Sequence, residues 1–215
     1  TLAAIAATQT FTNKTHTSPK INEDVALSAT STQLNEAGTK ATYTPRMVNL
    51  GAPALADDDL IVVSVVMFVG AYTVAAQPDI PRNLTVTTTA DGAGDTQGTI
   101  DVVGTDYANA ALTETITPIV GTTVAGLKAF KTVTSVTGVG WVIGEGNDTI
   151  KVGIGTKLGL PFADANLATD PQIGILGTTI TALVVTAHAT IPLTTVDMSS
   201  GTYNGTKKAV VLIVD

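Results

Sequence analysis

Short runs in which apolar and polar residues alternate are the clearest pattern in this chain. The runs are rich in Val, Ile and Thr and are bounded by Gly, Asn or Asp, which is typical of strands in an antiparallel sheet. The pattern predicts five consecutive strands: Asn83–Thr89, Thr99–Gly104, Leu112–Thr117, Leu127–Val136 and Thr149–Ile154. Since short polar breaks separate these strands, we expect a β-meander at the centre of an all-β fold, an antiparallel β-sandwich that is jelly-roll-like or immunoglobulin-like.

The β pattern continues on both sides of this centre. Leu60–Ala76 is almost entirely apolar, but it is shorter than the ~20 residues of a membrane-spanning helix. It is rich in β-branched residues and interrupted by Gly70, so it predicts a buried strand, a turn and a second strand. Residues 155–171 form a connection without strand pattern, in which Ala163–Ala168 is compatible with one helical turn. The later predicted strands are Ile173–Leu176, Thr179–Ala189, Ile191–Val196 and Ala209–Val214, the last of them central in its sheet or covered on both faces.

The first 57 residues differ from the rest of the chain. They are Thr-rich, weakly patterned and interrupted by prolines, so we expect an extended N-terminal arm over residues 1–57 and a β-sandwich domain over residues 58–215. Within the arm, short strands near Val25–Leu27 and Thr42–Leu50 and a helical turn at Ser31–Gly38 fit the sequence. The chain begins without methionine, for which removal of an initiator Met before a small residue is the simplest interpretation, and Leu2–Ala7 is too short for a signal peptide.

The amino-acid composition disfavours or excludes several classes of function. Of the 215 residues, 44% are hydrophobic and only 4% are aromatic, so the core must be built from Val, Ile, Leu and Ala. Charged residues make up 13%, about half the usual quarter. A surface with so little charge suits a protein that is covered by neighbours in an assembly. The net charge of −7 and the absence of a Lys/Arg stripe disfavour nucleic acid as a partner. The absence of cysteine removes thiol catalysis, Cys-ligated zinc and disulfides.

The two histidines do not predict a catalytic site. His188 alternates onto a polar strand face without a nearby acid, and a general base needs an orienting partner within hydrogen-bond reach. His16 lies in the expected arm. We therefore expect no catalytic residue here.

Acidic clusters leave one question open. Asp91 and Asp95 frame a loop that lacks the ligand spacing of an EF-hand, because Ala93 and Val102 stand at positions that require oxygen ligands. A hairpin loop is the preferred interpretation. A looser cation site formed by Asp91, Asp95 or the triplet Asp57–Asp59 remains the alternative.

Three further motifs give little evidence for a functional site. Gly153, Gly155 and Gly159 lack the spacing of a phosphate-binding loop, so they predict a turn and not a nucleotide site. Trp141, beside a glycine, is expected in the core, with a subunit contact as the alternative. The Asn-X-Thr triplets are interpreted as chance in a Thr-rich chain; they begin at Asn13, Asn83, Asn147 and Asn204. No Ser-His-Asp set is recognisable. The sequence thus predicts no catalytic, cofactor-binding or metal-binding residue, and a protein that is not an enzyme.

One pattern resembles a known group of proteins. It comprises Gly104–Ile116 (GTDYANAALTETI), Leu127–Thr137 (LKAFKTVTSVT) and Val152–Pro161 (VGIGTKLGLP). This pattern resembles one in virion proteins of tailed phages and prophages. In those proteins an alternating strand ends in Gly-Thr-Asp, the chain returns through Thr-Glu-Thr, and a similar Lys-Ala-Phe run follows. The likeness covers about Pro81 to Phe162. It is similar to capsid decoration (cement, or auxiliary) proteins and sometimes to tail components. It implies a virion structural role with no catalytic residues to carry over.

From this resemblance we expect a capsid decoration protein on the exterior of a virion, made in the host cytoplasm. Its partners would be the major capsid protein and copies of itself, in a homo-oligomer such as a homotrimer, with no nucleic acid, no membrane and no cofactor. The arm would add a strand to a neighbouring sheet edge and stabilise the shell by multivalency. The alternatives are a phage tail tube or fibre protein, and a carbohydrate-binding or adhesin β-sandwich module. Against the last stands the small number of aromatic residues: one Trp, four Tyr and four Phe.

Overall fold

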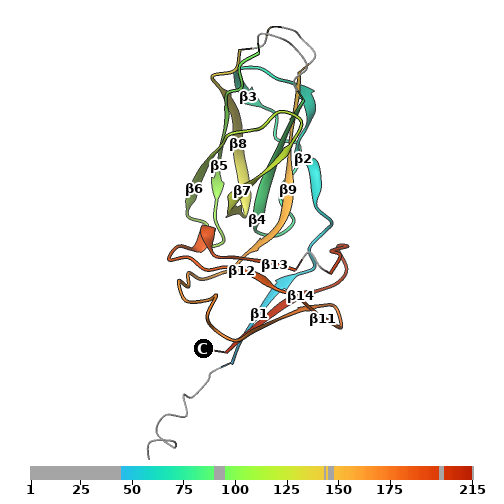
Figure 1. The fold of residues 1–215 in the computed structure, drawn as a ribbon, viewed down its shortest axis with the longest axis vertical. Coiled ribbons are helices and arrows are strands. Elements are labelled where there is room, and N and C mark those ends of the chain that lie inside the picture. Colours follow the sequence, from blue (N-terminus) through green and yellow to red (C-terminus); the bar gives the residue numbers. More distant parts are fainter. Residues whose placement is uncertain (1–44, 90–94, 143, 145–147, 199–200, 215) are drawn as a thin grey trace, which may run out of the picture. The chain divides into compact units, whose positions relative to one another are not determined.

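The computed structural model describes residues 45–89, 95–142, 144, 148–198 and 201–214 (Figure 1). They form antiparallel sheets with a single 3-10 turn, η1 (Ile191–Leu193), and no α-helix among them. The predicted all-β antiparallel sandwich is confirmed. Of the arm expected over residues 1–57, the part up to residue 44 lies outside the described residues, together with the features predicted at Val25–Leu27 and Ser31–Gly38.

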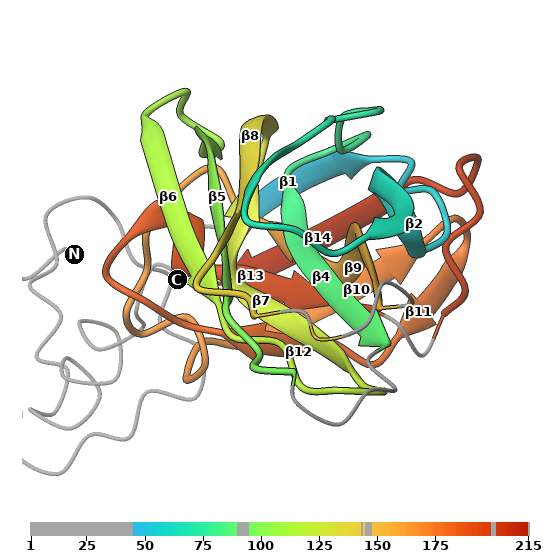
Figure 2. The same cartoon turned by 90° about the horizontal axis from the view of Figure 1, so that it is seen from above.

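Two four-stranded sheets face each other to make the sandwich. One has the order β2–β9–β4–β7 and the other the order β3–β8–β5–β6. Seen from above (Figure 2), β5, β6 and β8 lie to one side and β2, β4 and β9 to the other. The bounds are β2 (Asp57–Val66), β3 (Gly70–Tyr72), β4 (Arg82–Thr89), β5 (Thr99–Thr105), β6 (Ala111–Ile116), β7 (Thr123–Phe130), β8 (Thr132–Val139) and β9 (Thr149–Gly159).

The strand pairs are nested around one hairpin. β5 pairs with β6, β4 with β7, β3 with β8 and β2 with β9, each pair enclosing the one before it along the chain. Two further pairings, β9 with β4 and β8 with β5, roll this ribbon into two sheets. Eight antiparallel strands connected in this way form a jelly roll. The β-meander predicted at the centre is wrong, because β4 and β5 follow each other in the chain but lie in different sheets.

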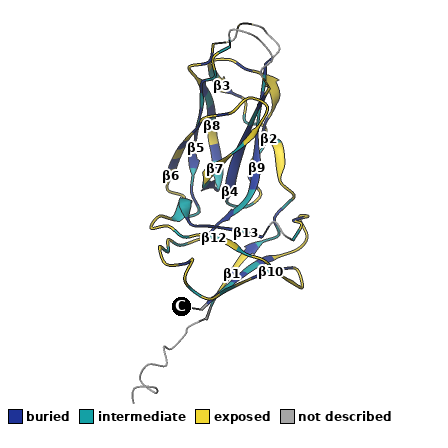
Figure 3. Cartoon of the chain, in the orientation of Figure 1, coloured by how far each residue is buried: buried dark blue, intermediate teal, exposed yellow. Residues whose placement is uncertain are grey.

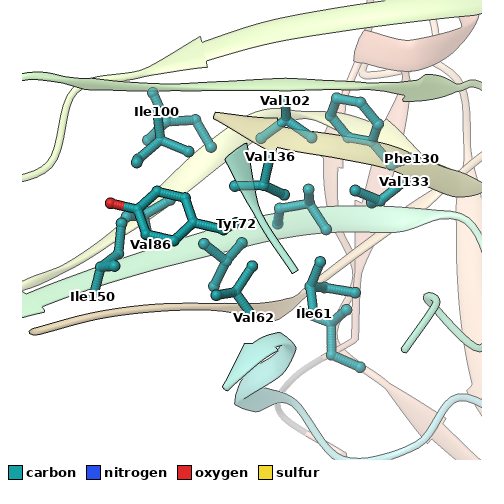
Figure 4. Packing of buried hydrophobic residues seen from close by; sticks show 14 of the residues in the cluster. Ile61, Val62, Tyr72, Val86, Ile100, Val102, Phe130, Val133, Val136 and Ile150 are labelled. Atoms are coloured by element: carbon teal, nitrogen blue, oxygen red, sulfur yellow. The ribbon is translucent and has the colours of Figure 1, made fainter. Parts of the chain in front are cut away.

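The strand predicted over Leu127–Val136 is two strands. The chain turns at Lys131, whose backbone N–H donates to the carbonyl of Thr105 at 2.8 Å, and β7 and β8 then belong to opposite sheets. Phe130 and Val133 are both buried, although strict alternation would place them on opposite faces. Both side chains enter the same core because the chain has crossed from one sheet to the other between them (Figure 4).

The space between the two sheets is filled by aliphatic residues with few aromatics. Ile61 and Val62 come from β2, Val86 from β4 and Ile100 from β5 (Figure 4). Trp141 belongs to the same cluster, so its predicted core position is confirmed. Burial of such side chains stabilises the fold by about 1.5–3 kcal/mol each relative to full exposure.

A second core lies beside the sandwich and is reached by the far end of β9. β9 extends past the predicted Ile154 to Gly159 and carries Leu158 into this core, which also holds Val211 and Ile213. The strands around it are β1 (Pro45–Gly51), β10 (Gln172–Leu176), β11 (Thr179–Thr181), β12 (Val184–Thr186), β13 (Thr195–Asp197) and β14 (Ala209–Val214). Four of them form the sheet β1–β14–β10–β11, and β13 pairs with β9 and β12. The predicted central position of the last strand is confirmed.

Four predictions in this region are wrong. The strand predicted over Thr179–Ala189 is divided into β11 and β12. The strand predicted over Ile191–Val196 begins as η1, because Pro192 lacks the N–H that a paired strand needs, and only its end belongs to β13. Ala163–Ala168 forms bends and turns without a helix, and the connection expected from residue 155 starts only after Gly159.

Candidate interaction sites

The acidic triplet Asp57–Asp59 opens β2 and is exposed. Its carboxylate oxygens lie within 4.8 Å of one another, and it is the one acidic cluster of this kind among the described residues. Asp58 forms an ion pair with Lys151 on β9. The pKa of Asp59 is raised, first by a hydrogen bond with the Asp57 carboxylate and further by the nearby negative charges. One lysine therefore does not balance the negative charge of the triplet.

Of the other cation-site candidates, Asp95 lies apart from the triplet. It precedes β5 and accepts a hydrogen bond from the backbone N–H of Gly144 at 2.5 Å. The preferred hairpin-loop interpretation is wrong, because the strands on either side of this loop, β4 and β5, lie in different sheets and do not pair with each other. Asp91 lies outside the described residues. The structure thus brings together only the triplet among the acidic residues singled out from the sequence.

A cleft of about 760 Å³ lies beside the triplet on the outer face of the β2–β9–β4–β7 sheet. Its floor consists of small side chains, including Thr85 on β4, Ala125 on β7 and Gly155 on β9, and its wall is formed by residues 54–58. The Thr85 hydroxyl is buried and makes no hydrogen bond within the described part of the chain. No aromatic side chain is found among the lining residues. The cleft therefore lacks the flat apolar platform on which sugar rings usually stack.

A buried arginine holds the wall of this cleft in place. The Arg82 side chain has no exposed surface, and its Nε donates to the carbonyl of Gly155 at 2.7 Å. Its Nη1 donates to the carbonyl of Ala54 at 3.1 Å and to Asp79 Oδ1 at 3.0 Å. Arg82 thus fixes the segment before β2 against β9, and its role is structural.

The glycines predicted to form a turn lie within β9, so that interpretation is wrong. A Cβ atom on Gly153 would stand 2.0 Å from the carbonyl oxygen of Asp57, and one on Gly155 would stand 2.4 Å from Asn83 Oδ1. Both glycines are needed because other chain segments approach the strand closely. Asn83 is itself buried and accepts a hydrogen bond from the backbone N–H of Lys157 at 3.0 Å.

His188 is exposed and makes only local polar contacts. Its Nδ1 lies 2.9 Å from the hydroxyl of Thr190, and its backbone pairs with that of Asp164. The Asp164 carboxylate is turned to Arg46, at 3.2 Å. His188 therefore stands in a bridge between two loops rather than on the predicted strand. His16, Asn13 and Asn147 lie outside the described residues.

A run of exposed apolar side chains follows β2 and the turn to β3. The strand and turn predicted from Leu60–Ala76 are present, but β2 is buried only at Ile61 and Val62 (Figure 3). The side chains beyond them are exposed: Val63 (57%), Val65 (38%), Val66 (47%), Phe68 (40%) and Val69 (62%). The prediction of a buried strand is wrong here, because β2 is an edge strand. Among the described strands, it pairs with β9 alone.

A groove of about 330 Å³ runs along this edge, which we call the β2 groove. Val63, Ser64 and Val65 form one side, and Ala71 to Ala75 form the other. The two sides meet where the backbone N–H of Ala75 donates to the carbonyl of Ile61 at 2.8 Å. Phe68 and Tyr72 close one end, with ring centroids 4.5 Å apart, and the Tyr72 hydroxyl donates to the Phe68 carbonyl at 2.8 Å. The groove is therefore firmly built and predominantly apolar.

The opposite edge of the sandwich, between β6 and β7, is closed. Glu114 on β6 accepts hydrogen bonds from the backbone N–H groups of Leu127 and Lys128 on β7, the first at 2.6 Å. The Lys128 ammonium donates in return to the carbonyl of Thr113 at 2.6 Å. An inward-pointing charge that occupies edge N–H groups blocks the addition of another strand. The sandwich has two sides on which its sheets end, one at β6 and β7 and one at β2 and β3. Within the described residues, the side at β2 and β3 has no such inward-pointing charge to block the addition of a strand.

No helix of the described residues has the length and hydropathy needed to cross a membrane. No protein-family model, curated protein or solved structure matches the chain.

Proposed function

We propose that this chain is a structural protein of a tailed-phage or prophage virion that decorates the outside of the capsid. It binds the major capsid protein and copies of itself as a cement protein and catalyses no reaction. The jelly roll serves as a rigid body, and contacts between copies and with the shell supply the function.

The exposed apolar edge at β2 is the observation that carries this proposal. Four valines and a phenylalanine lie exposed along the outer side of β2 and just beyond its end, where no described strand pairs with β2. Such an edge is a liability for a protein that remains alone, because it can pair with other chains. In an assembly the same edge becomes a contact surface. The low charge content, 13% of residues, fits a surface that neighbours cover.

The cleft beside the acidic triplet supports the carbohydrate-binding alternative less well. It is large enough for a sugar, but its lining combines small and aliphatic side chains with Asp57, Asp58 and Lys157 and has no aromatic platform. A sugar ring would therefore lack a flat surface on which to stack.

Binding to shells tests the proposal. The full chain is mixed with DNA-free shells of the phage or prophage that encodes it, and bound copies per shell are measured by co-sedimentation. Shells of an unrelated phage are the control. We expect saturable binding only to the matching shell, with added density at fixed positions on its outer lattice in electron microscopy. Absence of binding, or density confined to the tail, would contradict the capsid assignment.

A further inference from the structure

The β2 groove and the first residues of the chain are complementary to each other. We propose that residues 1–20 of a second copy add an antiparallel strand along β2, with their apolar start in the β2 groove and Lys14 beside the acidic triplet. This inference rests on the proposed function, in which copies of the chain associate, and it specifies the contact that joins them.

The apolar half of the match is found at the end of β2. Val63, Val65 and Val66 are exposed there, and Phe68 forms the end of the groove. The chain starts with the uncharged segment Leu2–Ala7 (LAAIAA), which carries small side chains and two larger aliphatic ones. A groove of about 330 Å³ accommodates a few such side chains and no bulky aromatic cluster.

The charged half of the match is found at the start of β2. Asp57, Asp58 and Asp59 lie there with Lys151 as the cation paired with Asp58. Residues 1–20 contain Lys14 and Lys20 and no acidic residue. A basic segment beside this triplet therefore lowers the repulsion among its carboxylates.

The order of these features along the two segments selects the antiparallel direction. β2 runs from its acidic start to its apolar end, whereas the N-terminal segment runs from its apolar start to Lys14. Placed antiparallel, with Thr8 opposite Val63, the alignment sets Leu2 opposite Val69 and Lys14 opposite Asp57. A parallel strand would place the apolar start against the carboxylates and Lys14 among the valines.

The residues between these two features also favour a strand. Thr8, Thr10 and Thr12 alternate with Gln9, Phe11 and Asn13, and Thr and Phe are frequent in strands. Main-chain hydrogen bonds to the part of the β2 edge that follows Ile61, whose carbonyl already accepts from Ala75, would supply most of the affinity, as in other cases of strand addition. The β6–β7 edge cannot accept this segment, because Glu114 occupies backbone N–H groups of β7.

Residues 21–44 separate this segment from β1. At ~3.3 Å per residue they reach about 80 Å when extended, which is ample to reach a neighbouring molecule. Filling the groove of a neighbour links copies into an assembly, which filling the groove of the same copy would not do.

Cysteine cross-linking tests the contact directly, because the chain contains no cysteine of its own. One full-length variant carries Thr8→Cys and another carries Val63→Cys, and the two are mixed and oxidised. We expect a heterodimer on a non-reducing gel. The matched control pairs Thr8→Cys with Val184→Cys on β12, a valine of similar exposure (67%) outside the groove, and is expected to give none.

Two results would overturn the inference. One is the absence of a heterodimer in the Thr8/Val63 mixture. The other is a cross-link formed within single chains, at every dilution, by a variant that carries both cysteines, because the segment would then fill the groove of its own copy.

A charge exchange tests the register independently. Lys14→Glu and Asp57→Lys are each expected to weaken self-association roughly threefold to tenfold, and the double variant to restore it. Val63→Asp is expected to weaken it more than tenfold, and Val184→Asp to leave it unchanged. Additive losses in the charge-exchanged double variant would contradict the pairing. Shell binding by the same variants is measured separately, so that loss of self-association with intact shell binding removes only this inference.

Discussion

Glu114 on β6 and Leu127 on β7 join the two sheets of the sandwich, since a carboxylate oxygen of Glu114 accepts the backbone N–H of Leu127 at 2.6 Å. Burial raises the pKa of the Glu114 carboxyl, and the hydrogen bonds from the N–H groups of Leu127 and Lys128 offset part of this effect. The same carboxylate therefore closes the β6–β7 edge, while its burial disfavours the ionised form of the side chain.

This arrangement predicts a pH dependence of stability. Between the ordinary Glu pKa of 4.5 and the raised value of the folded state, the folded protein holds the proton more tightly than the unfolded chain. The free energy of unfolding consequently decreases as the pH rises through this window. Glu114→Gln keeps an acceptor oxygen and removes the titration, so urea unfolding at several pH values is expected to show a smaller decrease. An unchanged slope in the variant would contradict the assignment.

Removal of the buried Arg82 side chain is expected to be severe. Arg82→Ala leaves the carbonyls of Gly155 and Ala54 without their donor and Asp79 without its ion pair, at a cost of about 3 kcal/mol in the free energy of unfolding. Lys151→Ala breaks the more exposed pair with Asp58 and is expected to cost much less than the loss of Arg82. Denaturant unfolding followed by the emission of the single Trp141 measures both. Equal effects would refute the anchoring role of Arg82.

Tyr203 predicts a loss of stability in alkali. Burial raises the pKa of its hydroxyl to about 12, although the hydrogen bond from the backbone N–H of Met198 works in the other direction. Because the phenolate forms at about pH 10 in the unfolded chain, the free energy of unfolding decreases as the pH rises from about 10 to about 12. Tyr203→Phe is expected to be destabilised by about 1–3 kcal/mol at neutral pH and to lose part of this alkaline slope. Parallel slopes for both proteins would show that another group titrates.

The glycines of β9 predict a steric effect at a defined place. Gly153→Ala forces a Cβ atom against the carbonyl oxygen of Asp57, so β2 must shift, and we expect a loss of about 1–3 kcal/mol in stability. Gly174→Ala on β10 is the control, since its nearest neighbour is the Thr181 hydroxyl at 3.2 Å. Thermal unfolding of both variants and hydrogen exchange along β2 measure the difference. If Gly153→Ala retained full stability, β2 would be able to move away from the added Cβ atom with little loss in the free energy of unfolding.

Much of the fold could be predicted from the sequence because one face of most strands is buried. β4, β5 and β6 alternate apolar and polar residues, and their ends lie within a residue or two of the predicted bounds. Period-2 alternation identifies a strand but does not say which strand it pairs with. The nesting of pairs around the β5–β6 hairpin was therefore not predictable, and consecutive strands suggested a meander instead.

The candidate sites were less predictable, for separate reasons. The apolar composition of β2 indicated burial, but the edge position of the strand leaves Val63 and its neighbours exposed. Glu114 alternates with apolar residues like any surface position, and only the approach of β7 makes it a buried acceptor. The sequence did contain a signal for the break between β7 and β8. Phe130 and Val133 are both apolar but an odd number of positions apart, and this spacing departs from the alternation of a single strand.

The nested pairing also constrains how the chain is made. The outermost pair joins Val62 to Val152, so a ribosome delivers β2 long before the strand that covers it. Among the four nested pairs, only the β5–β6 hairpin closes from residues synthesised close together, and contacts between distant residues slow folding. β2 thus remains unpaired on the nascent chain until β9 has emerged, and the strand that we propose as the contact between copies is also the one that most needs protection during synthesis.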